Sequence, residues 1–272
     1  MVATELAKVA AKVLKSYPIK GAKHINGSPI DRSWLTYCFD LFVDVKEVLV
    51  ANEKDCKPTA SKLFGRPFLP ADLEWPDGYY FYAQLNMREL APHDIHGILP
   101  ERGMLYLFYN PLAMDFLPSS KTAAKAMFVK DEQEAQVLRA KPPKSRLPSG
   151  GKHYYQNFLG KSYRMKFETA FSFSNPETLP KGLIETMAER LGIRSVEPWC
   201  NLFGQPISEE GEGESGLFRD EEVDEEDVPA DDPDRVMLLQ RDFVDSRIHF
   251  WARRDKMRKG DFEKLEVTAS AG

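Results

Sequence analysis

Hydrophobic and polar residues alternate along much of this chain in the two-residue period of β-strands. From Phe167 to Phe173, every second side chain is aromatic or β-branched, and the residues between are Glu168, Ala170 and Ser172. This pattern predicts a half-buried strand. Further strands are predicted at residues 34–45, 48–50, 79–87, 103–109, 236–240, 248–251 and 265–267, which are rich in β-branched and aromatic residues.

Two segments have the period of an amphipathic helix. In residues 3–16 the apolar side chains form one stripe, so we expect a docking helix, followed by a connector that ends at residue 24. Residues 183–191 have a similar stripe, and Gly192 can cap that helix. Charged residues interrupt the N-terminal segment, which excludes an ordinary signal peptide, and no run reaches the roughly 18 apolar residues of a membrane span. We therefore expect a soluble protein without membrane contact.

One signature occurs twice. Residues 63–67 (Leu-Phe-Gly-Arg-Pro) precede a strand pattern that contains Gln84, and residues 202–206 (Leu-Phe-Gly-Gln-Pro) precede one that ends on Gln240. An aromatic strand follows in both cases. The repetition predicts an α+β fold whose mostly antiparallel sheet is built from two similar halves, a pseudo-repeat of residues 63–109 and 202–251. Both halves would belong to a single domain of residues 25–268, with a groove between them as a natural binding location.

Charge is distributed unevenly along the chain. The formal net charge is −5, but residues 209–234 contain 14 acidic residues and one basic residue, a net charge of −13. The remaining body therefore carries +8. Such a segment cannot bury enough apolar area to fold alone, and we expect a mobile acidic loop.

Three roles for this acidic loop remain open. It can be a solvated loop, it can cover the basic surface of its own body, or it can capture a basic protein such as a nuclease-like toxin. The candidate partner-binding residues are its densest acidic run, Glu221, Glu222, Asp224, Glu225, Glu226 and Asp227. The basic body keeps nucleic-acid binding as a third and weaker possibility, since the acidic loop repels phosphate and no binding motif is recognisable.

The first signature resembles the YwqG-like family of bacterial proteins. The resemblance is carried by residues 61–70, by Glu74-Trp75-Pro76, by Ala83-Gln84-Leu85-Asn86 and by residues 103–108. Residues 202–206, 236–240 and 248–251 resemble the family's second half, although the acidic insertion, Asp245-Ser246 and His249 depart from its pattern. The family has no established activity, so the resemblance implies a bacterial domain of unknown role, which we place among interaction proteins.

Catalytic chemistry has little support in the sequence. His93 and His96 have a spacing that suits metal ligands, but Pro92 and Gly97 favour a loop, so we expect no metal. No serine or cysteine lies in a recognisable nucleophile motif, and no phosphate-binding glycine loop indicates a cofactor. Cys38, Cys56 and Cys200 are too few and too scattered for a disulfide framework, which favours a reducing cytoplasm. An enzyme, either a hydrolase or a transferase, remains the alternative to a binding protein.

The two corresponding glutamines are the best candidates for ligand contacts. A buried amide needs hydrogen-bond partners, which either the neighbouring Gly-x-Pro turn or a ligand can supply. We expect the candidate cleft to contain Tyr80, Tyr82, Gln84, Asn86, Gln240 and His249.

Overall fold

The structure is a computed structural model, and it describes residues 3–19, 23, 28–110, 119–120, 122–131, 136–138, 161–174, 176–205, 234–243 and 246–271. Within these residues, no helix is both long and apolar enough to cross a lipid bilayer. All of the acidic segment 209–234 except Asp234 lies outside the described residues.

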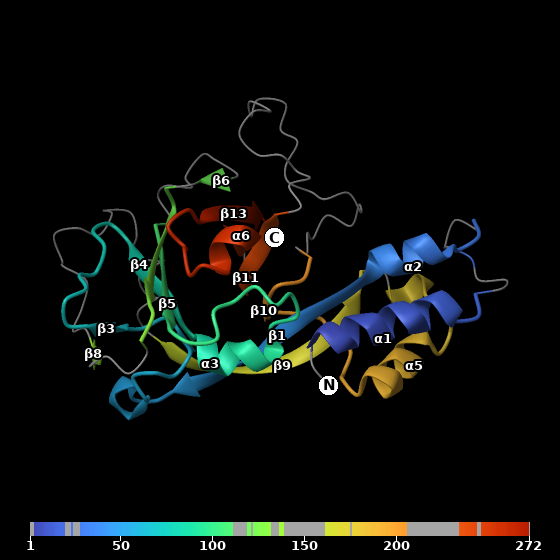
Figure 1. The fold of residues 1–272 in the computed structure, drawn as a ribbon, viewed down its shortest axis with the longest axis horizontal. Helices are drawn as coiled ribbons and strands as arrows, with labels where there is room; N and C mark the ends of the chain where they lie inside the picture. Colours follow the sequence, from blue (N-terminus) through green and yellow to red (C-terminus); the bar gives the residue numbers. More distant parts are fainter. Residues whose placement is uncertain are drawn as a thin grey trace.

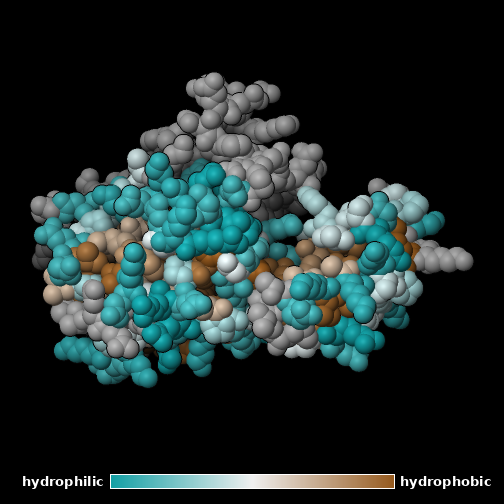
Figure 2. Space-filling model, in the orientation of Figure 1, coloured by the Kyte–Doolittle hydropathy of each residue, from teal (hydrophilic) through white to brown (hydrophobic). Residues whose placement is uncertain are grey.

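Three helices form a lobe at one end of the molecule (Figure 1). They are α1 (Ala3–Ser16), α2 (Arg32–Cys38) and α5 (Leu183–Leu191), and α1 spans the residues for which the sequence predicts a helix. Their apolar sides pack together and against Phe171 and Phe173 of the sheet in one buried cluster. Figure 2 shows hydrophobic residues at the surface of this lobe, among hydrophilic ones.

The first strand begins later than the sequence predicts. Residues 32–38 form a helix because the Asp31 side chain accepts a hydrogen bond from the backbone N–H of Trp34, at 2.8 Å, and so caps it. The strand begins only at Phe39.

One antiparallel sheet contains eleven of the described strands, in the order β6-β13-β12-β11-β10-β1-β9-β2-β4-β5-β7. In chain order these are β1 (Phe39–Val50), β2 (Lys62–Leu63), β4 (Tyr80–Asn86), β5 (Met104–Tyr109), β6 (Ser119–Ser120), β7 (Ala124–Val129), β9 (Ser162–Phe173), β10 (Cys200–Leu202), β11 (Arg235–Phe243), β12 (Ser246–Arg253) and β13 (Glu266–Ala271). A second, two-stranded sheet pairs β3 (Phe68–Pro70) with β8 (Gln136–Leu138).

The predicted α+β fold with two similar halves is wrong. The long strands β1 and β9 pair along their whole length, from Phe39 opposite Phe173 to Val50 opposite Ser162, and join both halves of the chain into one sheet. Within the described residues, the three longest helices lie at one end and the two others are single turns, so helices form no layer over the sheet. The edge strands β6 and β7 are four residues apart in the chain, so the two edges lie within roughly 14 Å of each other. The sheet therefore curls until it nearly closes.

The main hydrophobic core lies inside this curved sheet. The short helices α3 (Met87–Leu90) and α6 (Arg254–Met257) contribute Met87, Leu90 and Met257 to it. Below, the side of the sheet that faces this core is called the inner face, and the opposite side the outer face. The strand order is similar on the two sides of the β1–β9 pair. On one side β2, β4 and β5 follow in chain order, and on the other side β10, β11 and β12 do.

Candidate functional site

Gln84 is fully buried on β4 and bonds to its own chain. Its Oε1 accepts a hydrogen bond from the backbone N–H of Phe68, at 3.0 Å, just after the Gly-x-Pro turn. Its Nε2 donates to the carbonyls of Pro58 and Ala60, at 2.9 and 2.8 Å. The amide therefore holds two loop segments against the sheet.

A β-bulge separates the predicted cleft residues of β4. The register with β5 shifts between Phe81 and Ala83, so Tyr82 and Ala83 both reach the inner core while Phe81 lies in a separate outer cluster. Gln84 and Asn86 remain together, and Asn86 caps α3 by accepting from the N–H of Arg88, at 2.9 Å. Strict alternation predicts that Tyr80 and Tyr82 share a face with Gln84. Because of the bulge, the two tyrosines lie on the inner face and Gln84 lies on the outer face.

Gln240 and His249 are brought together on the other side of the sheet. They lie directly opposite each other on β11 and β12. Gln240 Nε2 donates to Asn201 Oδ1, at 3.2 Å, and Asn201 Nδ2 donates to the carbonyl of Phe203, at 2.9 Å. Four strands separate this pair from Gln84 and Asn86, so the six candidate residues do not form one cleft with each other. A ligand contact by any of them stays a prediction.

The outer face of β10–β13 is largely buried yet strongly polar, and we call it the polar face. Its members are Asn201, Arg235, Gln240, Asp242, Arg247, His249, Trp251, Glu266 and Thr268. Arg247 pairs with Asp242, with Nη2 and Oδ2 at 2.6 Å, and Arg235 pairs with Glu266, with Nη2 and Oε2 at 3.1 Å. The guanidinium of Arg235 also lies 4.3 Å from the centre of the Trp251 ring.

Beyond Gln84 and Asn86, the corresponding outer face of β4 and β5 has the opposite character. Phe81, Tyr106 and Phe108 are buried there under Leu69 and Trp75, which belong to the chain segment between β2 and β4. A buried apolar face needs nothing further for stability, whereas a buried polar face is retained at a cost unless its groups are paired. The polar face is therefore the stronger candidate for specific recognition.

A second candidate surface is exposed on the outer face of the central strands. It consists of Lys46, Val48, Arg164, Lys166 and Trp199, and we call it the basic strip. Lys46 lies opposite Lys166 in the β1–β9 ladder, and continuing the β1–β10 register by two residues places Trp199 beside Lys46. Trp199 is 56% exposed, which is unusual for this residue.

The carboxylates near the basic strip are already paired. Glu168 accepts from Lys46 at 2.7 Å and from Arg194 at 3.1 Å, and Arg194 also pairs with Asp44. Within the described residues, neither Arg164 nor Lys166 forms an ion pair. Among the described residues, the strip therefore presents two positive charges without an ion-pair partner and, on a neighbouring strand, an exposed indole.

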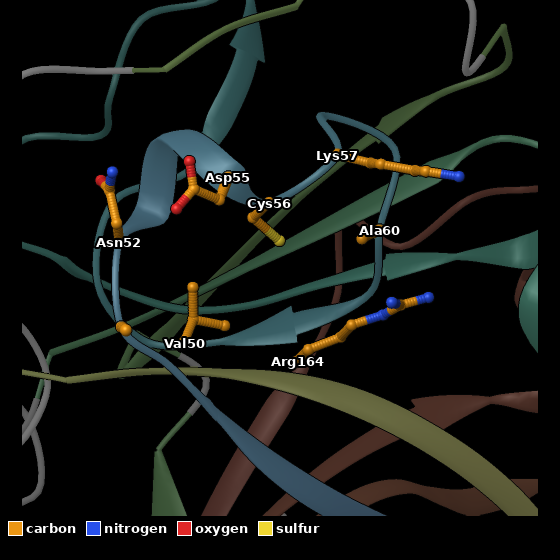
Figure 3. Close-up of a pocket in the computed structure, with 8 residues that line it drawn as sticks. Val50, Asn52, Asp55, Cys56, Lys57, Ala60 and Arg164 are labelled. Carbon is orange, nitrogen blue, oxygen red and sulfur yellow. The ribbon is translucent and has the colours of Figure 1, made fainter.

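A shallow pocket of about 220 Å³ lies next to the end of β1 (Figure 3). Lys57 and Arg164 extend on one side of it, Asn52 and Asp55 lie on the other, and the Cys56 side chain points toward the space between Val50 and Arg164. Burial raises the pKa of the Cys56 thiol, which keeps it protonated and unreactive near neutral pH. The pocket therefore has no activated nucleophile.

Sequence reasoning missed a buried ionic cluster beside this pocket. Lys62, which is fully buried, donates to Glu53 Oε1 at 2.9 Å, and Arg66 donates to Glu53 Oε2 at 2.6 Å. Lys62 Nζ also lies 5.4 Å from the ring centre of Phe68. The only sequence signal is a lysine directly before the Leu-Phe-Gly turn, where the second turn has Asn201.

His93 and His96, whose spacing suits metal ligands, have separate surroundings. His93 Nδ1 lies 3.2 Å from Thr169 Oγ1, and the His96 ring packs edge-on against Phe203. Burial lowers the pKa of both imidazoles. In the described part of the chain, no three His, Cys, Asp or Glu side chains are grouped so that they could hold a metal ion. The cysteines Cys38, Cys56 and Cys200 are free and buried.

The predicted partner-binding run, from Glu221 to Asp227, lies outside the described residues. Residues 61–269 match the model of a family described as a domain of unknown function, DUF1963. This match covers both signatures but does not test the resemblance to YwqG-like proteins. No curated protein matches the chain.

Proposed function

Because the chain belongs to the DUF1963 family, whose description assigns no activity, we propose from its own surfaces that it is a protein-binding module. The observation that carries this proposal is the basic strip, where Lys46 lies between exposed Trp199 and Lys166 on neighbouring strands of the sheet. Tryptophan and arginine supply much of the binding energy at protein interfaces.

The partner that suits this strip is an acidic polypeptide segment. Arg164 and Lys166 lack ion-pair partners within the described residues, so an incoming carboxylate gains attraction without displacing an existing pair. The acidic residues of 209–234 are such a segment, in the same chain or in another copy.

A basic protein and the basic strip would then compete for the same carboxylates of the acidic segment. A cationic partner, including a nuclease-like toxin, would bind Glu221, Glu222, Asp224, Glu225, Glu226 and Asp227 and release the basic strip. Cytoplasmic location fits this role and stays a prediction. Nothing among the described contacts favours the enzymatic alternative.

The test is a titration that monitors Trp199. A full-length variant with Glu221, Glu222, Glu225 and Glu226 changed to Gln and Asp224 and Asp227 changed to Asn is mixed with a synthetic peptide of residues 209–234. Peptide binding should change the fluorescence and weaken steeply with salt, because the attraction is between exposed charges.

Two charge reversals locate the binding surface. Adding Arg164→Glu and Lys166→Glu should weaken peptide binding about tenfold or more, since each exposed pair contributes up to about 1 kcal/mol. The matched control is Lys12→Glu on the exposed side of α1, which should leave binding unchanged. Equal affinity of both variants would refute the strip as the binding surface, and tighter binding of a DNA oligonucleotide than of the peptide would favour the nucleic-acid alternative.

A further inference from the structure

The pocket at the end of β1 adjoins the basic strip, because Arg164 belongs to both (Figure 3). The volume of the pocket is about 220 Å³. An apolar cavity of about 150 Å³ suffices to hold a benzene molecule. The pocket is therefore large enough for one aromatic side chain of a polypeptide that lies on the strip.

The buried part of the pocket lining is apolar. Cys56 and Ala60 are buried there, and together with the partly exposed Val50 they belong to a small apolar cluster that also contains Phe68. A buried free cysteine behaves as a small hydrophobe. Covering this surface with an apolar side chain removes it from water, so the lining favours an apolar group of a ligand.

The charged side chains of the pocket have opposite signs on opposite sides. Lys57 and Arg164 extend on one side, and Asp55 lies on the other. None of the three forms an ion pair within the described residues. A guanidinium such as that of Arg164 also attracts the face of an aromatic ring. The pocket therefore suits an aromatic side chain that has both acidic and basic residues next to it in the chain.

The acidic segment 209–234 contains one residue of this kind. Its large apolar side chains are Leu217, Phe218, Val223 and Val228. Phe218 is the aromatic one, and Arg219, the single basic residue of the segment, follows it directly. Acidic residues continue from Asp220, so Phe218 has neighbours of both charges, whereas Val223 and Val228 do not.

The chain is long enough to bring Phe218 to the pocket of the same molecule. Gln205 is held against Asp40 near the start of β1, and the pocket lies beside Val50, ten residues further along this strand, or roughly 33 Å away. The thirteen residues 206–218 span up to roughly 43 Å when extended. The sixteen residues 219–234 span up to roughly 53 Å, which suffices for the return to β11, two strands from β1.

We propose that the pocket beside Arg164 is a docking site for the phenyl ring of Phe218, which anchors the acidic segment of the same chain on the basic strip. In this arrangement Arg219 lies toward Asp55, and the acidic residues that follow lie toward Lys57 and Arg164. Docking of the ring rests on the proposed function, which supplies the electrostatic attraction, and adds the apolar contact that fixes where the segment binds.

Calorimetric titration of three synthetic peptides of residues 209–234 tests the anchor. One peptide has the native sequence, one carries Phe218→Ala, and the control carries Val228→Ala, so all three have the same charge. The receptor is the full-length variant with the six neutralised acidic residues, to which Phe218→Ala is added so that its own ring does not compete. The Phe218→Ala peptide should bind about tenfold more weakly, because a shallow pocket buries part of the ring. The control peptide should bind as the native one does.

Two changes in the receptor locate the ring. Ala51 is exposed and lines the pocket, so Ala51→Phe should occupy the space and weaken binding of the native peptide about tenfold. Ala71→Phe is the matched change at an exposed position outside the pocket lining and should leave the affinity unchanged. Wild-type protein should bind the native peptide at least tenfold more weakly than the receptor, because its own tethered segment competes. Urea unfolding confirms that each variant is folded.

The outcomes separate this docking site from the proposed function. Equal affinity of the native and Phe218→Ala peptides would overturn the docking site but leave the attraction between the strip and carboxylates in place. A loss from Phe218→Ala that Ala51→Phe does not reproduce would place the ring elsewhere and also overturn it. Equal binding of the native peptide by wild type and receptor would contradict docking within one chain. No binding of the native peptide at all would overturn both the docking site and the proposed function.

Discussion

Glu53 and Asp40 hold two turns that share one backbone conformation although they lie far apart in the chain. Phe64 and Phe203 have φ angles of 56° and 61°, and a glycine with positive φ follows each. Glu53 Oε1 accepts from the backbone N–H of Arg66 at 2.6 Å, and Asp40 Oδ2 accepts from that of Gln205 at 2.9 Å. Both turns thus depend on a carboxylate from another segment.

The two carboxylates differ in their electrostatic surroundings. Burial favours a raised pKa at Glu53, but its bonds with Arg66 and Lys62 outweigh burial and hold the pKa below its ordinary value. Among the described residues, backbone hydrogen bonds from Gln205 and Leu41 are what offsets the burial of Asp40, and burial raises its pKa from 3.8 to about 6. Replacing the carboxylate by the matching amide is therefore expected to lower the stability of the protein at Glu53 and to raise it at Asp40.

Glu53→Gln should destabilise the protein. It leaves the fully buried ammonium of Lys62 without its counter-charge, and breaking a buried ion pair in this way costs about 3 kcal/mol. Urea unfolding of the variant measures the loss. The control is Asp55→Asn, an exposed change in the same short 3-10 helix, Glu53–Asp55, which should alter stability by less than about 0.5 kcal/mol. A comparable loss in both variants would mean that the segment as a whole, not the ion pair, is sensitive.

Asp40→Asn should stabilise the protein above pH 6. Because the folded-state pKa is raised, the folded protein binds the proton more tightly, and this contribution to stability is lost as pH rises from about 4 through about 6. Asparagine keeps an acceptor oxygen for the N–H of Gln205 and removes the pH dependence. Melting temperatures across this range check the prediction, and a variant that is less stable than wild type at neutral pH would contradict it.

Gln84→Leu should be among the more damaging uncharged substitutions. It removes both acceptor and donors, leaving the N–H of Phe68 and the carbonyls of Pro58 and Ala60 unpaired in the interior. A loss of about 3 kcal/mol is expected, because each unsatisfied buried group costs about 1–3 kcal/mol. Gln205→Leu, an exposed change, should be nearly neutral in the same unfolding experiment. If Gln84→Leu left the free energy of unfolding nearly unchanged, these loops would be held by other contacts.

His249 should make the protein sensitive to acid. Its pKa is about 3 in the folded state and 6.5 ordinarily, so unfolding takes up a proton and stability is lost as pH falls below about 6.5. The loss at about pH 5 is about 2 kcal/mol relative to neutral pH. Arg247, Arg235, Asp242 and Glu266 surround the same face and remain in His249→Phe, so the wild type minus variant difference isolates the imidazole. An acid response that survives in the variant would assign it to those other groups.

The sequence predicts strands better than it predicts what joins them. The alternation from Phe167 to Phe173 was correctly read as a strand, because alternation depends only on which side of one strand is buried. The α+β fold of two halves was wrong because β1 pairs with β9, more than 110 residues later, and a single sequence contains no signal for that pairing. The cap at Asp31 shows a similar limit, since its local hydrogen bond overrides the strand pattern that follows.

The candidate site was predictable only in part. Gln240 and His249 do lie together, because their strands follow one another in the chain and pair as a hairpin. Tyr80 and Tyr82 were misplaced because a bulge after Phe81 changes the side on which later residues lie, and bulges leave little trace in composition. Trp199 and Lys166 could not be paired from sequence, since the β1 strand that brings them together lies far from both in the chain.

Carbodiimide crosslinking of the full-length wild-type protein tests the binding account most directly. The reagent joins a lysine to a carboxylate only where the two are in contact, and mass spectrometry identifies the joined residues. The account predicts crosslinks between Lys166 or Lys46 and the acidic residues of 209–234, which high salt and free peptide 209–234 should suppress. Crosslinks from these carboxylates to Lys12 and other distant lysines, with none to Lys166 or Lys46, would contradict it.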